Sequence, residues 1–283
     1  MPPDNVSDNA ITLAQQLGQH ALPAFGIGLA VCLVLVAAVW WLTVRHWVPQ
    51  AQRRLQPTAF LALHIALGGL GVLAAAWGFA EIASRIGSPD QMGPVGRFDD
   101  ALVATLRDTL SRPTLEAFAW VTRFGDTPTL TVLGITVALW LLLRKRYALA
   151  LGWVLAVGGN SLLNVGLKSI FERVRPLHEH GVAVAQGYSF PSGHSSGSLV
   201  AYGMLAYVVL RCLPPTAPRG LGLLAMLLAA SIAFATGCSR IFLQVHYASD
   251  VLAGFTSGMA WLVVCISAVE ALRQRQSTGL APK

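Results

Sequence analysis

The segment Lys168-Ser-Ile-Phe-Glu-Arg-Val-Arg175-Pro176 closes one apolar run and opens the stretch, residues 168 to 250, that organises this chain. A second cluster, Pro191-Ser192-Gly193-His194, directly precedes another apolar run. A third, Ser239-Arg240 followed by His246 and Asp250, joins two more. At each place a side chain can stay hydrated while the neighbouring apolar segment holds its backbone. The clusters therefore indicate one polar site carried on long apolar segments.

The composition is that of an integral membrane protein. Of 283 residues, 54% are hydrophobic and 12% are charged, and the mean hydropathy is +0.59. A net charge of +7 suggests nucleic acid in a soluble protein, but here the basic residues form short clusters beside apolar runs, so we expect no nucleic-acid partner. The four cysteines are far apart within or beside apolar segments and are typical of packing residues. The first apolar run lacks a preceding Lys or Arg, so we expect it to be retained and not cleaved as a signal peptide.

Seven apolar runs approach the length of about 20 residues that a helix needs to cross the hydrocarbon. Their approximate limits are 24 to 44, 58 to 81, 127 to 143, 147 to 168, 194 to 212, 220 to 238 and 248 to 270. The predicted fold class is all-α, a polytopic bundle of membrane helices.

The basic residues predict the orientation of this bundle. The joints after the first, third, fifth and seventh runs hold 11 of the 20 Lys and Arg residues: Arg45, Arg53, Arg54, Arg144, Lys145, Arg146, Arg211, Arg219, Arg273, Arg275 and Lys283. By the positive-inside rule these joints are cytoplasmic. The N-terminus and all three polar clusters are then expected outside.

The loop between the second and third runs also has helical periodicity. Apolar residues recur among charged neighbours at Phe98, Ala101, Leu102, Thr105, Leu106 and Leu110. This pattern indicates either an amphipathic helix on the outer face or a solvated connector. Ser111-Arg112-Pro113 interrupts it, and a second short helix through Phe118, Val121 and Phe124 is expected to lead into the third crossing.

The first cluster pairs two cations. Lys168 and Arg175 are seven residues apart, so on a helix they share one face and suit a phosphate. The alternative is snorkelling, in which basic residues at helix ends reach for lipid phosphates. Glu172 is spaced to pair with either cation.

The second cluster has the features of a helix start. Ser192 is a good N-cap, and the free N–H groups that follow favour an anion. An ordinary capped helix with a surface His194 is the alternative. The small residues Ser195, Ser196, Gly197 and Ser198 leave room for a ligand or for close helix packing.

The third cluster places His246 and Asp250 at positions i and i+4, with the aspartate inside the last apolar run. An ionisable residue inside a crossing indicates function. The carboxylate can accept the Nδ1–H of the imidazole and leave Nε2 as a nucleophile or base, or the pair can merely join two helices. Arg240 adds a third cation nearby.

A metal site is a weaker alternative. Four histidines are expected on the outer side, namely His178, His180, His194 and His246, but no carboxylate or thiol stands at zinc-like spacing from them. We interpret His178 and His180 as solvated loop residues.

Together the clusters resemble the type 2 phosphatidic acid phosphatase (PAP2) superfamily, which also includes the vanadium haloperoxidases. Its signature is Lys, six residues, Arg-Pro; then Pro-Ser-Gly-His; then Ser-Arg, five residues, His, three residues and Asp. Every position is matched, by Lys168, Arg175, Pro176, Pro191 to His194, Ser239, Arg240, His246 and Asp250. The soluble haloperoxidases lack the membrane runs and fit poorly. The resemblance implies a six-helix core over residues 58 to 270, with an extra N-terminal transmembrane helix and joint in residues 1 to 57 and a cytoplasmic tail in residues 271 to 283.

The resemblance also implies a mechanism. His246 would attack phosphorus and form a phosphohistidine, with Asp250 orienting it, and His194 would act as general acid and then as general base. The phosphate oxygens would be held by Lys168, Arg175, Ser192, Gly193 and Arg240. Three cations are present, so we expect no metal and no cofactor.

The leading hypothesis is therefore a lipid phosphatase of the cell (inner) membrane with its active site on the outer or periplasmic side. Phosphotransfer to an acceptor other than water, and non-catalytic binding of a lipid phosphate by a transporter or scaffold, remain alternatives. Binding alone has no use for an oriented imidazole, which favours catalysis. The substrate is left open among a polyprenyl diphosphate such as undecaprenyl diphosphate, phosphatidate, phosphatidylglycerol phosphate and a lipid A phosphate. No obligate protein partner is evident.

Overall fold

The computed structural model describes residues 5–47, 57–87, 91–177, 181–214 and 216–277. Seven segments in these ranges are helices long and apolar enough to cross a membrane, which confirms the predicted all-α membrane bundle. The long helices are α2 (Ala21–Trp41), α4 (Pro57–Ile86), α7 (Thr127–Leu143), α8 (Tyr147–Phe171), α9 (Gly193–Cys212), α10 (Arg219–Phe242) and α11 (Ala248–Ser277). Each overlaps one predicted run. Helix α2 continues as the short π-helix η1 (Leu42–Trp47).

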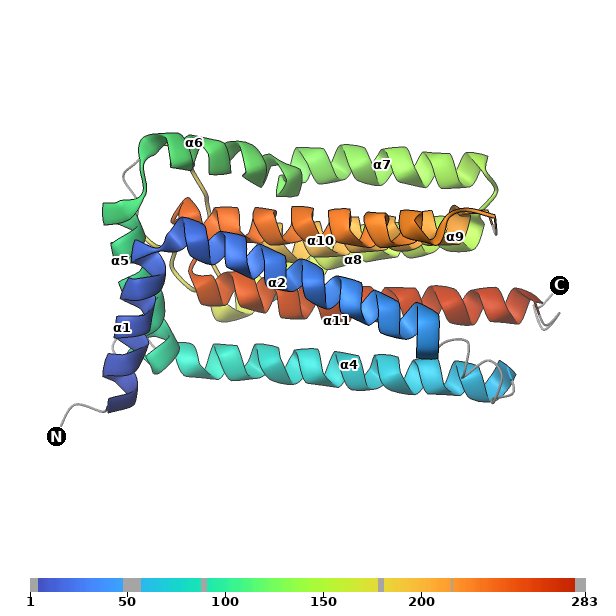
Figure 1. Cartoon of the computed structure of the whole chain (residues 1–283), viewed down its shortest axis with the longest axis horizontal. Helices are drawn as coiled ribbons and strands as arrows, with labels where there is room; N and C mark the ends of the chain where they lie inside the picture. Colours follow the sequence, from blue (N-terminus) through green and yellow to red (C-terminus); the bar gives the residue numbers. More distant parts are fainter. Residues whose placement is uncertain (1–4, 48–56, 88–90, 178–180, 215, 278–283) are drawn as a thin grey trace.

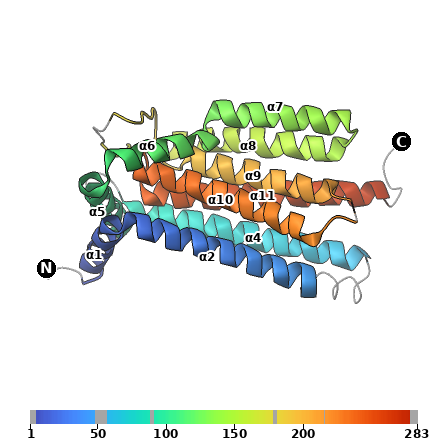
Figure 2. The ribbon, with the colours of Figure 1, turned by 45° about the horizontal axis from the view of Figure 1, so that its top comes forward.

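The long helices run alongside one another in a single bundle (Figures 1 and 2). Helix α9 packs against α8, α10 and α11, and α4 packs against α11. A core of buried apolar side chains lies between α7, α8, α9 and α11, and includes Trp153, Val200, Met204, Leu262 and Val269. Helix α2 packs on α10 at the edge of the bundle, and its Ile27 and Val34 are each 66% exposed. Apolar side chains exposed on a long helix are expected to face lipid.

A layer of shorter helices crosses one end of the bundle. It contains α1 (Asn5–Gln19) and α5 (Pro94–Thr109), while α6 (Arg112–Val121) and the 3₁₀ turn η2 (Thr122–Gly125) follow α5 and run along the bundle in line with α7 (Figure 1). The periodic loop is thus a helix, α5, and Leu102, Val103 and Leu106 are buried on its inner face. The expected second short helix is α6, with η2 continuing it towards α7.

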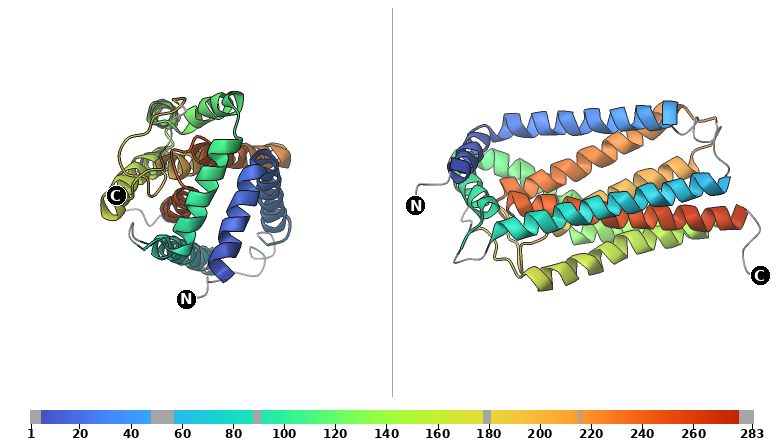
Figure 3. Two further views of the ribbon diagram at one scale, coloured as in Figure 1. Left: turned by 90° about the vertical axis from the view of Figure 1, so that its left-hand side faces the viewer. Right: turned by 90° about the horizontal axis from the view of Figure 1, so that it is seen from below.

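Helix α1 was not predicted. It lies side by side with α5 across the end of the bundle (Figure 3, left). A Cβ on Gly18 would lie 2.7 Å from Cβ of Thr105, so the two helices approach closely there. The buried face of α1 contains small residues such as Ala14.

The two ends of the bundle differ in character. The α7–α8 turn, the α9–α10 connection and the C-terminal end of α11 gather at the end far from α1 and α5 (Figure 1). These are basic joints predicted to be cytoplasmic. The three polar clusters gather at the opposite end, beneath the α1–α5 layer. The predicted basic residues Arg53, Arg54 and Lys283, and also His178 and His180, lie outside the described residues.

Candidate active site

The first polar cluster does not form the continuous helix that its spacing suggested. Helix α8 ends at Phe171, and Glu172 adopts a left-handed conformation with φ of 45°. Residues 172–177 are not helical, and Arg175 precedes Pro176, a position at which the helical conformation is disfavoured. Lys168 and Arg175 therefore do not share a helix face. They still converge, since both line one pocket.

Both cations are held by backbone carbonyls of the segment that precedes α9. Arg175 donates from Nε to Gly187 O (2.9 Å) and from Nη2 to Gln186 O and Tyr188 O (3.1 Å each). Lys168 donates to the carbonyls of Tyr188 and Ser189. Glu172 instead accepts a hydrogen bond from the Tyr188 hydroxyl (2.9 Å), so it is not needed to neutralise either cation.

The second cluster is a capped helix start, as predicted. Ser192 is the N-cap of α9, and its Oγ accepts hydrogen bonds from Ser195 N (3.4 Å) and Ser195 Oγ (2.9 Å). Ser195, Ser196 and Ser198 are buried between helices, while Gly197 lines the pocket of the site, so both predicted uses of these small residues are seen. Gly193 faces α8, where a Cβ would lie 2.9 Å from Asn164 Oδ1.

The third cluster forms a buried histidine–aspartate pair. His246 is 2% exposed and Asp250 is fully buried. Nδ1 of His246 lies 3.3 Å from Oδ2 of Asp250, and Arg175 Nη1 lies 3.0 Å from Nε2 of the same ring. A guanidinium can only donate, so Nε2 must be the accepting nitrogen and the ring proton must be on Nδ1. The neighbours of His246 thus fix the tautomer that the sequence predicted.

Arg240 is the third cation of the site. It is 5% exposed in the last turn of α10, and its Nη1 donates to Thr122 Oγ1 (2.7 Å) in η2. Its Nε is buried and has no hydrogen-bond partner among the described residues. A buried, charged donor without a partner is costly, which indicates that an anion completes this site.

These side chains meet around one pocket of about 480 Å³. Six of the eight predicted site residues line it: Lys168, Arg175, Gly193, His194, Arg240 and His246. Ser192 and Asp250 are fully buried, and a hydrogen bond from Ser192 N to Asp250 O (2.9 Å) joins them directly. Residues from four apolar helices and two loops therefore converge on a single cationic cavity.

The pocket extends between α7 and α8 towards the membrane. Leu130 and Thr131 of α7 line it on one side, and Val157, Ser161 and Val165 of α8 line it on the other. Val165 is also 67% exposed on the outer surface of the bundle. The cavity is thus continuous with a face that meets lipid.

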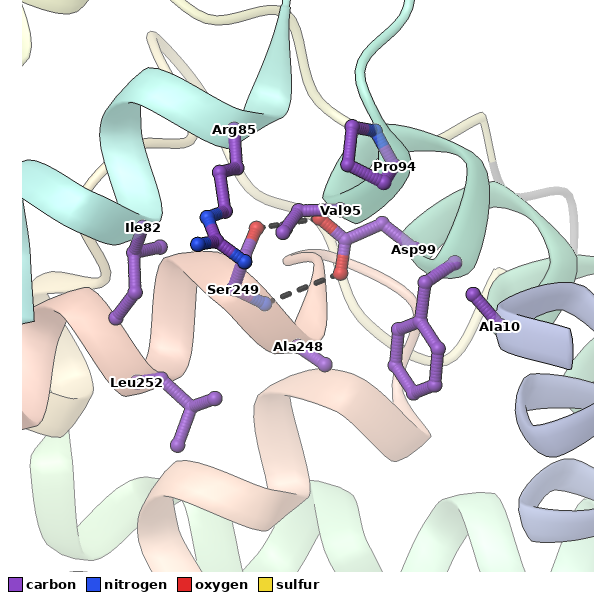
Figure 4. A pocket seen from close by; sticks show the side chains of 10 residues that line it. Ala10, Ile82, Arg85, Pro94, Val95, Asp99, Ala248, Ser249 and Leu252 are labelled. Carbon is purple, nitrogen blue, oxygen red and sulfur yellow. Dashed lines mark hydrogen bonds between the residues drawn. The ribbon is translucent and has the colours of Figure 1, made fainter. Parts of the chain in front are cut away.

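Three residues that contact the site were not predicted to belong to it, namely Asp99, Arg173 and Asp126. Arg173 donates from Nη1 to Asp250 Oδ1 (2.7 Å) and from Nη2 to Asp99 Oδ2 (2.9 Å) of α5. Asp99 also accepts hydrogen bonds from the backbone N–H (3.1 Å) and the hydroxyl of Ser249, as Figure 4 shows. The sequence did indicate a buried role for Asp99, because this residue lies on the same face of α5 as the buried Leu102 and Leu106. An aspartate on an apolar face needs a buried partner.

The other missed residue is Asp126, at the start of α7. Its Oδ1 lies 2.8 Å from Nε2 of His194. In the sequence, an aspartate before Thr-Pro reads as an ordinary N-cap, so its contact with a residue 68 positions away gave no local signal.

The charges around His246 act on its protonation. Burial, followed by the positive charges of Arg175 and Arg240, holds the pKa of His246 well below its ordinary value. The ring is therefore neutral at pH 7, which is the state that can act as a nucleophile. Asp250 therefore accepts the Nδ1–H hydrogen bond of a neutral ring, and in the resting state it does not have to balance a positive charge on His246.

Within the described ranges, no group of three or more histidine, cysteine or acidic side chains is placed to hold a metal ion. His178 and His180, which carried the metal alternative, lie outside those ranges. The expectation that activity needs no metal stays a prediction.

Comparisons with known proteins identify the family of this chain. The model of the family described as the PAP2 superfamily matches residues 147–274, which contain all three clusters. Phosphatidylglycerophosphatase B of Bacillus subtilis (strain 168) is 32% identical over 149 residues, covering 51% of this chain and 70% of that protein. The crystal structure of a transmembrane PAP2 type phosphatidylglycerolphosphate phosphatase from Bacillus subtilis aligns with a TM-score of 0.60 and 26% identity, covering 72% of this chain and 96% of that one.

Proposed function

Because this chain belongs to the PAP2 superfamily of membrane lipid phosphatases, we propose that it hydrolyses a lipid phosphate at the outer face of the membrane through a phosphohistidine on His246. One observation carries the proposal. The Nε2 lone pair of His246 is directed to the cationic pocket, where Arg175 Nη1 lies 3.0 Å away, while Nδ1 is held by Asp250. A phosphate bound by Arg175 would therefore meet the nucleophilic nitrogen of the ring.

The three cations and the start of α9 would hold the phosphate. Lys168, Arg175 and Arg240 line one cavity, and the unpartnered Nε of Arg240 supplies a donor that an anion would satisfy. The N–H groups at the helix start, beginning at Gly193, favour the same charge. As phosphorus passes from the ester oxygen to Nε2, these donors would stabilise the charge on its equatorial oxygens.

Two features support entry of a lipid substrate from the outer side of the bilayer. The pocket continues between α7 and α8 to lipid-facing Val165, so a head group could enter while its acyl chains stay in the hydrocarbon. The described basic joints gather at the opposite end of the bundle (Figure 1). By the positive-inside rule the active-site end faces outwards.

We propose phosphatidylglycerol phosphate as the first substrate to test. The Bacillus subtilis protein that is 32% identical to this chain is a phosphatidylglycerophosphatase. Undecaprenyl diphosphate, phosphatidate and a lipid A phosphate would each present a terminal phosphoryl group to the same cations.

The test is phosphate release by the purified full-length protein in detergent micelles from each of these four lipids, with EDTA present. We expect release from at least one lipid, with the chelator having no effect, since the cations supply the charge that a metal would provide. His246→Ala should abolish release, and His20→Ala, in the connection between α1 and α2, serves as the matched histidine control.

Three outcomes would contradict the proposal. Wild-type protein that releases phosphate from none of the lipids is no lipid phosphatase of this class. Release that persists in His246→Ala would show that this ring is not the nucleophile. Appearance of the phosphate on an added alcohol in place of free phosphate would identify a phosphotransferase.

A further inference from the structure

The turn that precedes α7 lies against the second histidine of the site. Asp126 is the N-cap residue of α7, yet its side chain makes no capping hydrogen bond. Its Oδ1 instead lies 2.8 Å from Nε2 of His194. A carboxylate at this position ordinarily bonds to the first N–H groups of its own helix. The diversion of Asp126 from that role indicates a function connected with His194.

The same turn is held in place by other site residues. Arg240 Nη1 donates to Thr122 Oγ1 (2.7 Å), and the Tyr202 hydroxyl donates to Phe124 O (2.8 Å). Gly125 permits the close approach, since a Cβ there would lie 2.5 Å from Thr236 Cγ2 and 3.1 Å from His194 Cδ2. The carboxylate is therefore delivered to His194 by a turn fixed from α9 and α10.

The contact determines which nitrogen of His194 carries a proton. A carboxylate only accepts, so Nε2 of His194 must be the donor, and Nδ1 is the nitrogen left for a reacting oxygen. We propose that Asp126 is a positioning residue that fixes the tautomer and orientation of His194 for acid–base catalysis. This inference rests on the proposed function, because it needs His194 to act on the substrate.

The proton transfers balance as follows. In the first step the P–O bond breaks, Nε2 of His246 bonds to phosphorus, and Nδ1–H of protonated His194 gives its proton to the leaving oxygen. In the second step water gives a proton to Nδ1 of His194 as its oxygen bonds to phosphorus and the P–N bond breaks. Throughout both steps Asp126 accepts the Nε2–H hydrogen bond and takes no proton.

The test compares Asp126→Asn on two substrates. Asparagine is also a good N-cap, so the start of α7 is retained. The measured quantity is the rate of phosphoenzyme formation, with p-nitrophenyl phosphate, whose leaving group needs no protonation, and with the best lipid phosphomonoester of the panel, whose alkoxide does. A general acid contributes on the order of 10²- to 10⁴-fold, and a residue that orients it about 10- to 100-fold.

We expect Asp126→Asn to slow the lipid reaction by about 10- to 100-fold and the nitrophenyl reaction by less than about threefold. Asp126→Glu should recover part of the lipid rate. Asp108→Asn, an exposed aspartate on α5 with the same change of charge, should alter neither rate. Thermal unfolding of the two asparagine variants should be similar.

Equal losses on both substrates would make Asp126 a structural residue, and no loss on either would make it dispensable. Either result overturns the inference while leaving His246 as nucleophile. Failure of the wild-type protein to form phosphoenzyme with either substrate would instead overturn the proposed function itself.

Discussion

At the scale of single residues, the candidate chemistry depends on which nitrogen of each histidine is free. Arg175 and Asp250 bracket the ring of His246 and leave Nε2 as its accepting nitrogen. In His194 the arrangement is reversed: Nε2 donates to Asp126, and Nδ1 is the accepting nitrogen. The two rings are therefore prepared for different tasks, one as nucleophile and one as acid and base.

The pKa of His246 predicts an activity that persists at acid pH. The reactive neutral ring is populated above its pKa, and burial with Arg175 lowers that pKa. In His194→Ala, where only one site histidine titrates, the burst of nitrophenol release should therefore retain its rate below the ordinary histidine pKa of about 6.5. Arg175→Gln removes a positive charge and should move the acid limb to higher pH. An acid limb above that ordinary value in His194→Ala would contradict this reading.

Asp250→Asn should lose most activity while the protein still folds. In the wild type, Oδ2 accepts hydrogen bonds from Tyr247 N (3.0 Å) and His246, and Oδ1 accepts from Arg173. The amide of asparagine has only one accepting oxygen, so it cannot satisfy both sets of donors. The wrong tautomer of a histidine in a comparable triad costs about 10⁴-fold in kcat. Phosphate release should fall by a similar order, with circular dichroism unchanged. A loss of less than about tenfold would remove Asp250 from its orienting role.

At the scale of elements, the site depends on helices that approach closely. A Cβ on Gly254 of α11 would lie 2.5 Å from Ser192 O, and one on Gly258 would lie 3.0 Å from Cα of Ser196. The two glycines are four residues apart, a spacing that lets membrane helices pack backbone to backbone. This contact joins the α9 start, with its N–H groups, to the helix that carries Asp250.

Gly254→Ala should therefore damage both stability and catalysis. The added methyl group meets backbone, which cannot move as a flexible side chain can, and overpacking of this kind costs about 1–3 kcal/mol. We expect a lower midpoint of thermal unfolding and slower phosphate release. Gly69→Ala in α4 is the matched control, since no heavy atom lies within 4 Å of its added Cβ. Equal behaviour of the two variants would show that α9 and α11 do not need this contact.

The sequence predicted the long helices because length and hydropathy mark a membrane crossing without knowledge of its neighbours. It also predicted the Ser192 cap and the His246–Asp250 pair, which are local in sequence. It missed what depends on the fold: the non-helical path to Arg175, the Asp99–Arg173 contact and the Asp126–His194 contact. The last two pairs are separated by 74 and 68 residues.

At the scale of the whole molecule, the bundle has a basic end and a catalytic end. The helices of the α1–α5 layer cover the catalytic end, and Asp99 links that layer to the site through Arg173 and Ser249. A lipid phosphate would approach from the side, between α7 and α8, and not through this cover.

The distribution of charge predicts the topology. Tags at the N-terminus and after Gly87 should be accessible from outside the cell membrane, and a tag after Lys283 only from inside. Labelling of intact and permeabilised cells with an impermeant reagent measures this directly. A cytoplasmic N-terminus, or a tag after Gly87 protected from outside reagent, would reverse the orientation or remove the first crossing.

The most direct test of a phosphohistidine mechanism is trapping of the phosphoenzyme in two variants with p-nitrophenyl phosphate. His194→Ala keeps the nucleophile and loses the base for hydrolysis, so acid-labile phosphoenzyme should accumulate on His246. His246→Ala should yield none. Phosphoenzyme in His246→Ala and none in His194→Ala would contradict the assignment and exchange the two roles. Phosphate release that is unchanged in both variants would also contradict it, and would leave a site that only binds lipid phosphate.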